Sequence, residues 1–172
     1  MLNISSDEIR LSGIIEESIV DGPGFRFVIF TQGCPKRCFL CHNEETQSLT
    51  GGYIEKLDKI VLMFSNNPLI KGITISGGEP FIQPDKVLYL VRKAKELNLN
   101  VLLYSGFYYN ELQRMNDSVK TILKEADYLI DGPFVHTEKN LNLLFRGSNN
   151  QRIIDLKETN KINDLVFIDS FE

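Results

Sequence analysis

Short apolar runs that end at glycine or at an Asp-Gly pair recur along the chain and predict β-strands. Phe25–Thr31 combines β-branched and aromatic residues between two glycine-containing turns, which is typical of a strand. Three later runs have the same form. They are Gly72–Ser76, Asn100–Ser105 and Asp127–Ile130.

Segments with helical spacing lie between these runs. In Asp85–Leu97, apolar residues recur every three or four positions and charged residues fill the other face, which predicts an amphipathic helix that begins after Pro84. Tyr53–Phe64 and Asn110–Glu125 show weaker patterns of the same kind, and Leu165–Ile168 is a candidate edge strand. Regular alternation of strand and helix predicts an α/β fold with a mainly parallel sheet.

Polar or glycine-rich sequence follows each predicted strand. These segments are a cysteine-containing loop, Gly77-Gly78-Glu79, Gly106 and Asp131-Gly132. In barrels and open α/β sheets, chemistry is found at the carboxyl ends of the strands. The segments are therefore expected to meet at one edge of the sheet.

Length and composition narrow the class of protein. With 172 residues, 42% hydrophobic and 24% charged, the chain is expected to form one domain with an ordinary core. Its net charge is −4, and no Lys/Arg block indicates direct nucleic-acid binding. The first residues lack the features of a secretory signal, and no apolar run is long enough to span a membrane. A cytoplasmic location is the default expectation.

The chain has three cysteines, all within eight positions: Cys34, Cys38 and Cys41. An odd, clustered set is a poor disulfide framework and a plausible metal site in a reducing compartment. A [4Fe–4S] cluster has four irons, so three thiolates leave one iron open to another ligand. The alternatives are structural cysteines, or structural zinc with His42 as fourth ligand. Zinc is disfavoured because adjacent residues such as Cys41 and His42 rarely point at one tetrahedral ion.

The spacing C-x₃-C-x₂-C directly after the first strand resembles that of the radical S-adenosylmethionine (SAM) superfamily. The resemblance implies that the open iron binds the amino and carboxylate groups of SAM. One electron from the cluster then cleaves the sulfonium and gives a 5′-deoxyadenosyl radical. Gly77-Gly78-Glu79 resembles the GGE motif of these enzymes, whose backbone and acidic side chain meet the methionine amino group. A plain tight turn is the alternative for the glycine pair.

Further SAM contacts are implied by the same resemblance. Leu40 matches a position whose backbone lies near the adenine, and His42 continues the cluster loop. Tyr104, Ser105 and Gly106 end a predicted strand, where related enzymes place ribose or methionine contacts. An ordinary strand end is the alternative for that triplet.

Other motifs resemble the activating enzymes of glycyl radical enzymes. Val20–Arg26 (VDGPGFR) and Cys41-His42-Asn43 match that group. Asp131–Phe134 (DGPF) with Phe145–Arg152 (FRGSNNQR) resembles the activators of anaerobic (class III) ribonucleotide reductase. The resemblance covers residues 9–156 of a single domain, 1–172, and leaves 157–172 as a C-terminal extension. The RGSNNQ segment either holds the fold together or meets a partner, and His136 is interpreted as an ordinary surface residue.

The resemblance also implies a reaction and its partners. Flavodoxin or ferredoxin reduces the cluster, and the radical removes a hydrogen atom from a glycine of the large reductase subunit. No acid–base residue is required. An incomplete TIM-type (β/α) barrel is expected, open at one side to a protein loop. A partner surface is expected at Asp21, Gly22, Pro23, Gly24 and Arg26.

Two alternatives stay open. One is a radical SAM enzyme that acts on another glycyl radical enzyme or on a small molecule, as the deazaguanine synthase of queuosine biosynthesis does. The other is a non-catalytic iron–sulfur or zinc interaction module. Only the enzyme hypotheses predict that Gly78→Val loses SAM binding while it retains the cluster.

Overall fold

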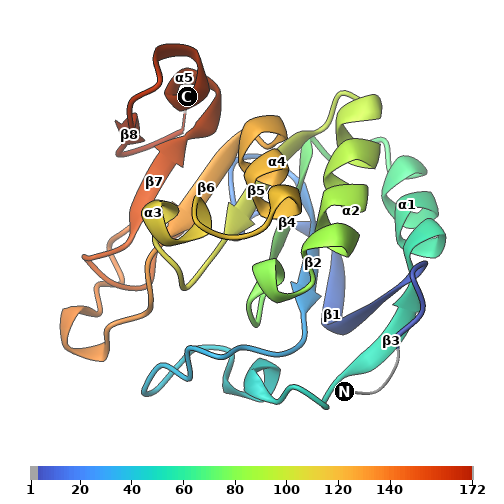
Figure 1. Cartoon of the computed structure of the whole chain (residues 1–172), viewed down its shortest axis with the longest axis horizontal. Coiled ribbons are helices and arrows are strands. Elements are labelled where there is room, and N and C mark those ends of the chain that lie inside the picture. The colour runs from blue at the N-terminus through green and yellow to red at the C-terminus, as the bar shows by residue number, and fades with distance from the viewer. Residues whose placement is uncertain (1–3, 172) are drawn as a thin grey trace.

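The computed structural model describes residues 4–171. Within this range, eight strands form one sheet in the order β3-β1-β2-β4-β5-β6-β7-β8 (Figure 1). The strands are β1 (Glu8–Ser18), β2 (Arg26–Thr31), β3 (Tyr53–Lys56), β4 (Gly72–Gly77), β5 (Asn100–Tyr104), β6 (Tyr128–Asp131), β7 (Arg152–Asp155) and β8 (Phe167–Ile168). The helices are α1 (Leu57–Ser65), α2 (Pro84–Glu96), α3 (Tyr109–Leu112), α4 (Asp117–Glu125) and α5 (Leu156–Ile162).

The α/β class is confirmed, but the prediction of a mainly parallel sheet is wrong. Strands β2, β4, β5 and β6 are the four predicted strands, and they are parallel neighbours. The outer strands β3, β1, β7 and β8 pair antiparallel with their neighbours. Three of the seven pairings in the described chain are therefore parallel and four antiparallel. The reason is that β1 and β7 form no βαβ unit and instead pair directly with the strands next to them along the chain.

The predicted helices agree with the structure to different degrees. The helix expected over Asp85–Leu97 is α2, with Pro84 in its first turn. Tyr53–Phe64 divides into β3 and α1. Asn110–Glu125 divides into α3 and α4, because the Asn116 side chain accepts a hydrogen bond from the backbone N–H of Val119 and starts a new helix.

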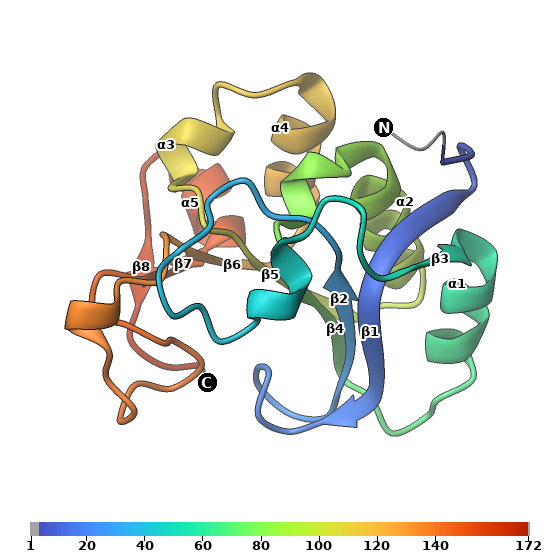
Figure 2. The same cartoon turned by 90° about the horizontal axis from the view of Figure 1, so that it is seen from below.

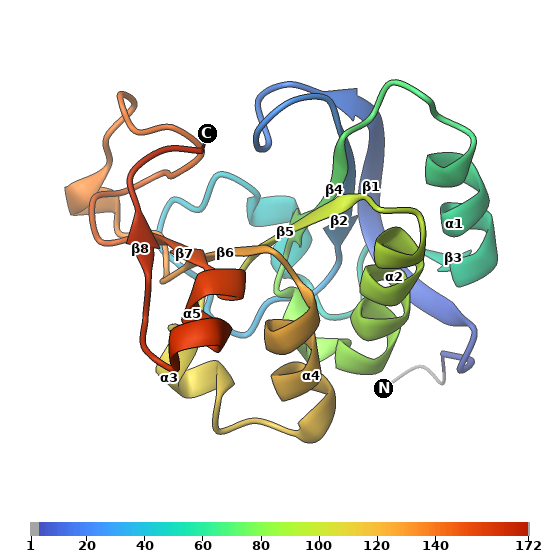
Figure 3. The ribbon, with the colours of Figure 1, turned by 90° about the horizontal axis from the view of Figure 1, so that it is seen from above.

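The two faces of the sheet have different coverings. Helices α1, α2 and α4 pack on one face (Figure 3), over a core that includes Phe27, Ile73 and Leu103. Because side chains alternate along a strand, the other face carries Arg26, Thr74 and the residues of a second, smaller apolar cluster. The buried members of that cluster are Leu102, Ile130 and Ile153. Loops and two short 3-10 helices, Glu44–Gln47 and His136–Glu138, lie on this side of the sheet (Figure 3).

None of the helices within residues 4–171 is long and apolar enough to cross a bilayer.

Candidate active site

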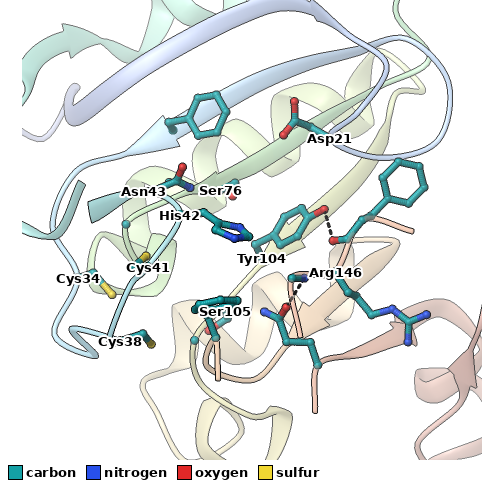
Figure 4. Close-up of a pocket in the computed structure, with 18 of the residues that line it drawn as sticks. Asp21, Cys34, Cys38, Cys41, His42, Asn43, Ser76, Tyr104, Ser105 and Arg146 are labelled. Atoms are coloured by element: carbon teal, nitrogen blue, oxygen red, sulfur yellow. Dashed lines mark hydrogen bonds between the residues drawn. The ribbon is translucent and has the colours of Figure 1, made fainter. Parts of the chain in front are cut away.

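The segments that follow the parallel strands meet at one cavity of about 490 Å³ (Figure 4). Parallel strands end at the same edge of a sheet, and this edge holds the predicted chemistry. Figure 2 shows the loop after β2 reaching across the strand ends toward the segment between β6 and β7. From the predicted site, the lining residues include Asp21, Cys34, Cys38, Cys41, His42, Gly77, Gly78, Tyr104, Ser105 and Gly106.

The cysteine loop is held to the sheet by backbone hydrogen bonds. Gly33 N donates to Thr46 O at 2.7 Å, and Cys34 N donates to Gln47 O at 3.1 Å. Left-handed backbone at Arg37 (φ 46°) and Leu40 (φ 53°) turns the loop back on itself. All three thiols are free, half-buried and line the cavity. Burial raises the pKa of the Cys34 thiol above its usual range.

The donor set fits an iron–sulfur cluster better than a single zinc ion. Within residues 4–171, no three Cys, His, Asp or Glu side chains are close enough together to hold one metal ion. The ring of His42 lies against Phe134, with the centroids 4.8 Å apart. Thiolates on a [4Fe–4S] cluster bind separate irons, so three sulfurs around one cavity suit that cluster without converging on a point.

Gly77 and Gly78 join the end of β4 to the start of the cysteine loop. Gly78 N donates to Thr31 O, and Glu79 N donates to Gly33 O, both at 2.8 Å. Gly77 has φ +96°, and a Cβ at Gly78 would overlap the Gly33 carbonyl oxygen. Only glycine permits this approach of two backbones. The pair is therefore more than a tight turn, since it also positions the loop that carries the cysteines.

Glu79 contacts the end of β5 and does not line the cavity. Its carboxylate is fully buried and accepts hydrogen bonds from Ser105 Oγ at 3.1 Å, Gly106 N at 2.8 Å and Phe81 N at 3.2 Å. The side chain is therefore not exposed to the cavity, and its predicted contact with a ligand ammonium group stays a prediction. Glu79 instead positions Ser105 and Gly106, which do line the cavity.

Burial of the Glu79 carboxylate makes stability depend on pH. Burial raises its pKa from 4.5 to about 7, although its hydrogen bonds oppose the shift. The folded chain thus keeps a proton that the unfolded chain releases. This stabilisation is complete below pH 4.5 and is lost as the pH rises through about 7. We expect the free energy of unfolding to fall by about 3 kcal/mol over that window relative to Glu79→Gln, in denaturant titrations of both proteins. Parallel curves for the two proteins would rule this out.

Tyr104 connects β5 to the far wall of the cavity. Its hydroxyl donates to Phe145 O at 2.8 Å, and burial raises the pKa of the phenol. Leu40 is half-exposed and does not line the cavity. The predicted contact between its backbone and adenine stays a prediction.

The DGPG turn is only partly a surface feature. Asp21 lines the cavity, and its Oδ2 accepts a hydrogen bond from Ser18 Oγ at 2.5 Å. Arg26, by contrast, is 1% exposed and donates to Thr74 Oγ1 at 2.6 Å and to Ile73 O at 2.5 Å. Burial lowers the pKa of its guanidinium to about 10. The prediction of a partner contact is wrong for Arg26, which braces the turn from inside, and for Gly22, which is buried against it.

Replacing Arg26 is expected to destabilise the fold. Arg26→Met leaves buried carbonyl and hydroxyl groups without donors, a loss of about 3 kcal/mol in the free energy of unfolding. Arg26→Lys should recover little of this stability, because an ammonium group cannot reproduce the planar set of donors of a guanidinium group. Denaturant unfolding is the measurement, with the exposed Arg114→Met as the control. Equal losses of unfolding free energy in Arg26→Met and Arg114→Met would show that the buried hydrogen bonds of Arg26 do not stabilise the fold.

The RGSNNQ segment fastens the DGPF segment. Gln151 Oε1 accepts from Gly147 N at 2.7 Å, and Gln151 Nε2 donates to Gly132 O at 3.1 Å. Asn150 Nδ2 donates to Pro133 O at 2.8 Å. These amides hold the fold together, the first of the two roles expected for the segment. Sequence reasoning did not assign Lys36, Phe134, Leu141, Phe145 and Arg146 to the site, although all line the cavity.

Comparison with known proteins bears directly on this site. Residues 20–154 match a family model described as a 4Fe-4S single cluster domain. An anaerobic ribonucleoside-triphosphate reductase-activating protein from Vibrio cholerae is 33% identical over 143 residues, which cover 78% of this chain and 90% of that protein. The chain belongs to this family of activating proteins. The corresponding protein of Enterobacteria phage T4 is 31% identical over 142 residues, 78% of this chain and 86% of that protein.

Of two further similar proteins, one is a larger enzyme and the other is much less similar in sequence. The pyruvate formate-lyase-activating enzyme of Clostridium pasteurianum is 34% identical over 129 residues, which cover 69% of this chain but only 53% of that enzyme. The solved structure of QueE from Escherichia coli shares 15% identity at a TM-score of 0.46, covering 58% of this chain and 52% of that one. Membership of the activating-protein family confirms the radical SAM resemblance, and with it a [4Fe–4S] cluster and SAM as cofactors.

Proposed function

We propose that this protein generates the glycyl radical on the large subunit of anaerobic ribonucleotide reductase. The observation that carries the proposal is the single cavity lined by the three cysteines, the glycine pair, the end of β5 and residues of both C-terminal motifs. The names of the relatives from Vibrio cholerae and phage T4 support the same target.

The chain's own residues hold and shield the reacting groups. Bound together, the cluster and SAM supply a 5′-deoxyadenosyl radical when an electron arrives. Cys34, Cys38 and Cys41 hold the cluster at one end of the cavity. The backbones at Gly77, Gly78, Ser105 and Gly106 would receive the methionine part of SAM, with His42 beside them. Orientation and exclusion of water do the rest, so no acid–base residue is required.

The partner is proposed to enter from the face of the sheet opposite α1, α2 and α4. In a full (β/α) barrel, this face would be the closed interior. Here the parallel strands β2, β4, β5 and β6 are flanked by antiparallel strands, and within residues 4–171 loops and short 3-10 helices lie on the face opposite α1, α2 and α4 (Figure 3). These features support the incomplete TIM-type barrel with an open side. Asp21 at the cavity, with Pro23 and the exposed Gly24, forms the part of the turn that can meet the partner. Flavodoxin or ferredoxin as donor and a cytoplasmic location complete the proposal.

Electron paramagnetic resonance (EPR) of the partner tests the proposed function. The reconstituted protein, SAM and a reductant are incubated without oxygen with the large subunit of anaerobic ribonucleotide reductase. The proposal predicts a glycyl radical signal that disappears when the target glycine of the subunit is replaced by Ala. A glycyl radical signal on pyruvate formate-lyase and not on the reductase subunit would show that pyruvate formate-lyase is the partner. SAM cleavage without a radical on either protein would favour a small-molecule substrate.

A further inference from the structure

The C-terminal segment after α5 returns to the sheet on the face that carries the cavity. Strand β8 pairs antiparallel with β7, with Ile168 opposite Ile153. Ile168 and Phe171 then pack against the smaller apolar cluster, which Phe145 and Tyr104 also contact. The extension thus reaches residues that line the cavity, since Phe145 and Tyr104 are among them.

Phe171 connects the sheet to the cavity wall through two aromatic contacts. Its ring lies 4.9 Å from that of Tyr128 and 5.5 Å from that of Phe145, both edge-on. Two residues before Phe171, the backbone oxygen of Asp169 accepts a hydrogen bond from Arg146 Nη2 at 3.4 Å. Two consecutive residues of the wall, Phe145 and Arg146, are therefore held by the C-terminal segment.

The backbone at Phe145 needs such support. Phe145 has φ +59°, a conformation that costs free energy for a bulky residue and persists only where its surroundings impose it. Tyr104 holds its carbonyl group and Phe171 holds its ring. In Figure 4, Arg146 lies on the far side of Tyr104 from the three cysteines. The supported wall therefore lies at the end of the cavity away from the cluster ligands.

We propose that Phe171 is a positioning residue, which fixes the Phe145–Gly147 wall of the cavity in the conformation that receives the protein partner. The proposal rests on the proposed function for the identity of that partner. The contact between Phe171 and the wall can be tested without the partner. Because the wall lies away from the cysteines, its displacement should affect the partner more than SAM.

Trypsin cleavage after Arg146 tests the contact itself. In the reconstituted full chain, Phe171→Ala should speed this cleavage about three- to tenfold, the effect of losing one or two aromatic contacts. Phe167→Ala is the matched control, because Phe167 lies 52% exposed against Arg152 and outside the cavity lining. Phe171→Tyr should restore slow cleavage. Equal rates in the two alanine variants would overturn the proposal, whatever the function of the protein.

Kinetics with the reductase subunit test whether the position of this wall affects binding of the partner. Phe171→Ala should raise the KM for the subunit about three- to tenfold and leave 5′-deoxyadenosine formation without the subunit unchanged. An unchanged KM for the subunit, or a raised KM for SAM alone, would overturn the assignment of this wall to the partner. If the wild-type protein forms no glycyl radical on the subunit, the proposed function fails, and the trypsin result still decides whether Phe171 positions the wall.

Discussion

Replacing Cys38 with Ala is expected to abolish 5′-deoxyadenosine formation. Cys38 lies between Cys34 and Cys41 on one loop, and all three thiols line the same cavity. The sequence holds no fourth cysteine to take its place. Two thiolates cannot hold a four-iron cluster as three do. After anaerobic reconstitution, iron and sulfide per chain should fall, and 5′-deoxyadenosine should drop to the level measured without SAM.

The matched control for this variant is the neighbouring residue. Phe39 is 74% exposed and does not line the cavity, so Phe39→Ala should retain both the cluster and SAM cleavage. Wild-type iron content and SAM cleavage in Cys38→Ala would mean that the loop is not the cluster site. Bound zinc in the wild-type protein in place of iron would lead to the same conclusion.

A side chain at Gly78 is expected to remove the cluster as well as SAM binding. The added Cβ would lie 2.8 Å from the Gly33 carbonyl carbon and 2.9 Å from Thr46 O. Backbone cannot move aside as a flexible side chain can, so Gly78→Ala should cost more than about 3 kcal/mol in the free energy of unfolding. The displaced backbone carries the cysteine loop. Iron content and SAM binding should therefore fall together, measured by iron analysis and by equilibrium dialysis of SAM.

This expectation differs from the one based on sequence alone, in which a larger residue at Gly78 spares the cluster. Gly13→Ala is the control, because a Cβ at Gly13 meets no atom within 4 Å, and stability and iron content should be nearly unchanged. A stable Gly78→Ala protein with full iron content and no SAM binding would favour the sequence-based expectation over the structural one.

The parallel centre of the fold could be predicted because its signals are local. Strands β2, β4, β5 and β6 are short apolar runs bounded by glycine or Asp-Gly, and the structure places each within about one residue of its predicted range. Strand β1 was not predicted. Its pairing with β2 shifts register between Leu11 and Gly13 and again between Ile15 and Ser18. Such irregularities interrupt the alternation of apolar and polar residues by which a strand is recognised.

The candidate site shows the same division between local and long-range information. The cysteine spacing and the glycine pair could be found in sequence, because each motif is continuous along the chain. The inward orientation of Arg26 could not, since it depends on Thr74 and Ile73 of a neighbouring strand. The burial of Glu79 likewise depends on Ser105 and Gly106, more than 20 residues away. The sequence does not distinguish motif residues that stabilise the fold from those that face the cavity. Their packing in the structure does.

Isotope transfer from the target glycine to SAM would show whether the cavity brings the two together. The large subunit of anaerobic ribonucleotide reductase is prepared with α-deuterated glycine and incubated with the reduced, reconstituted protein and SAM. If the cavity brings SAM and the target glycine together, mass spectrometry should find one deuterium in each 5′-deoxyadenosine formed with the glycyl radical. A glycyl radical accompanied by unlabelled 5′-deoxyadenosine would show that the hydrogen atom is not transferred directly, and would contradict this account of the site.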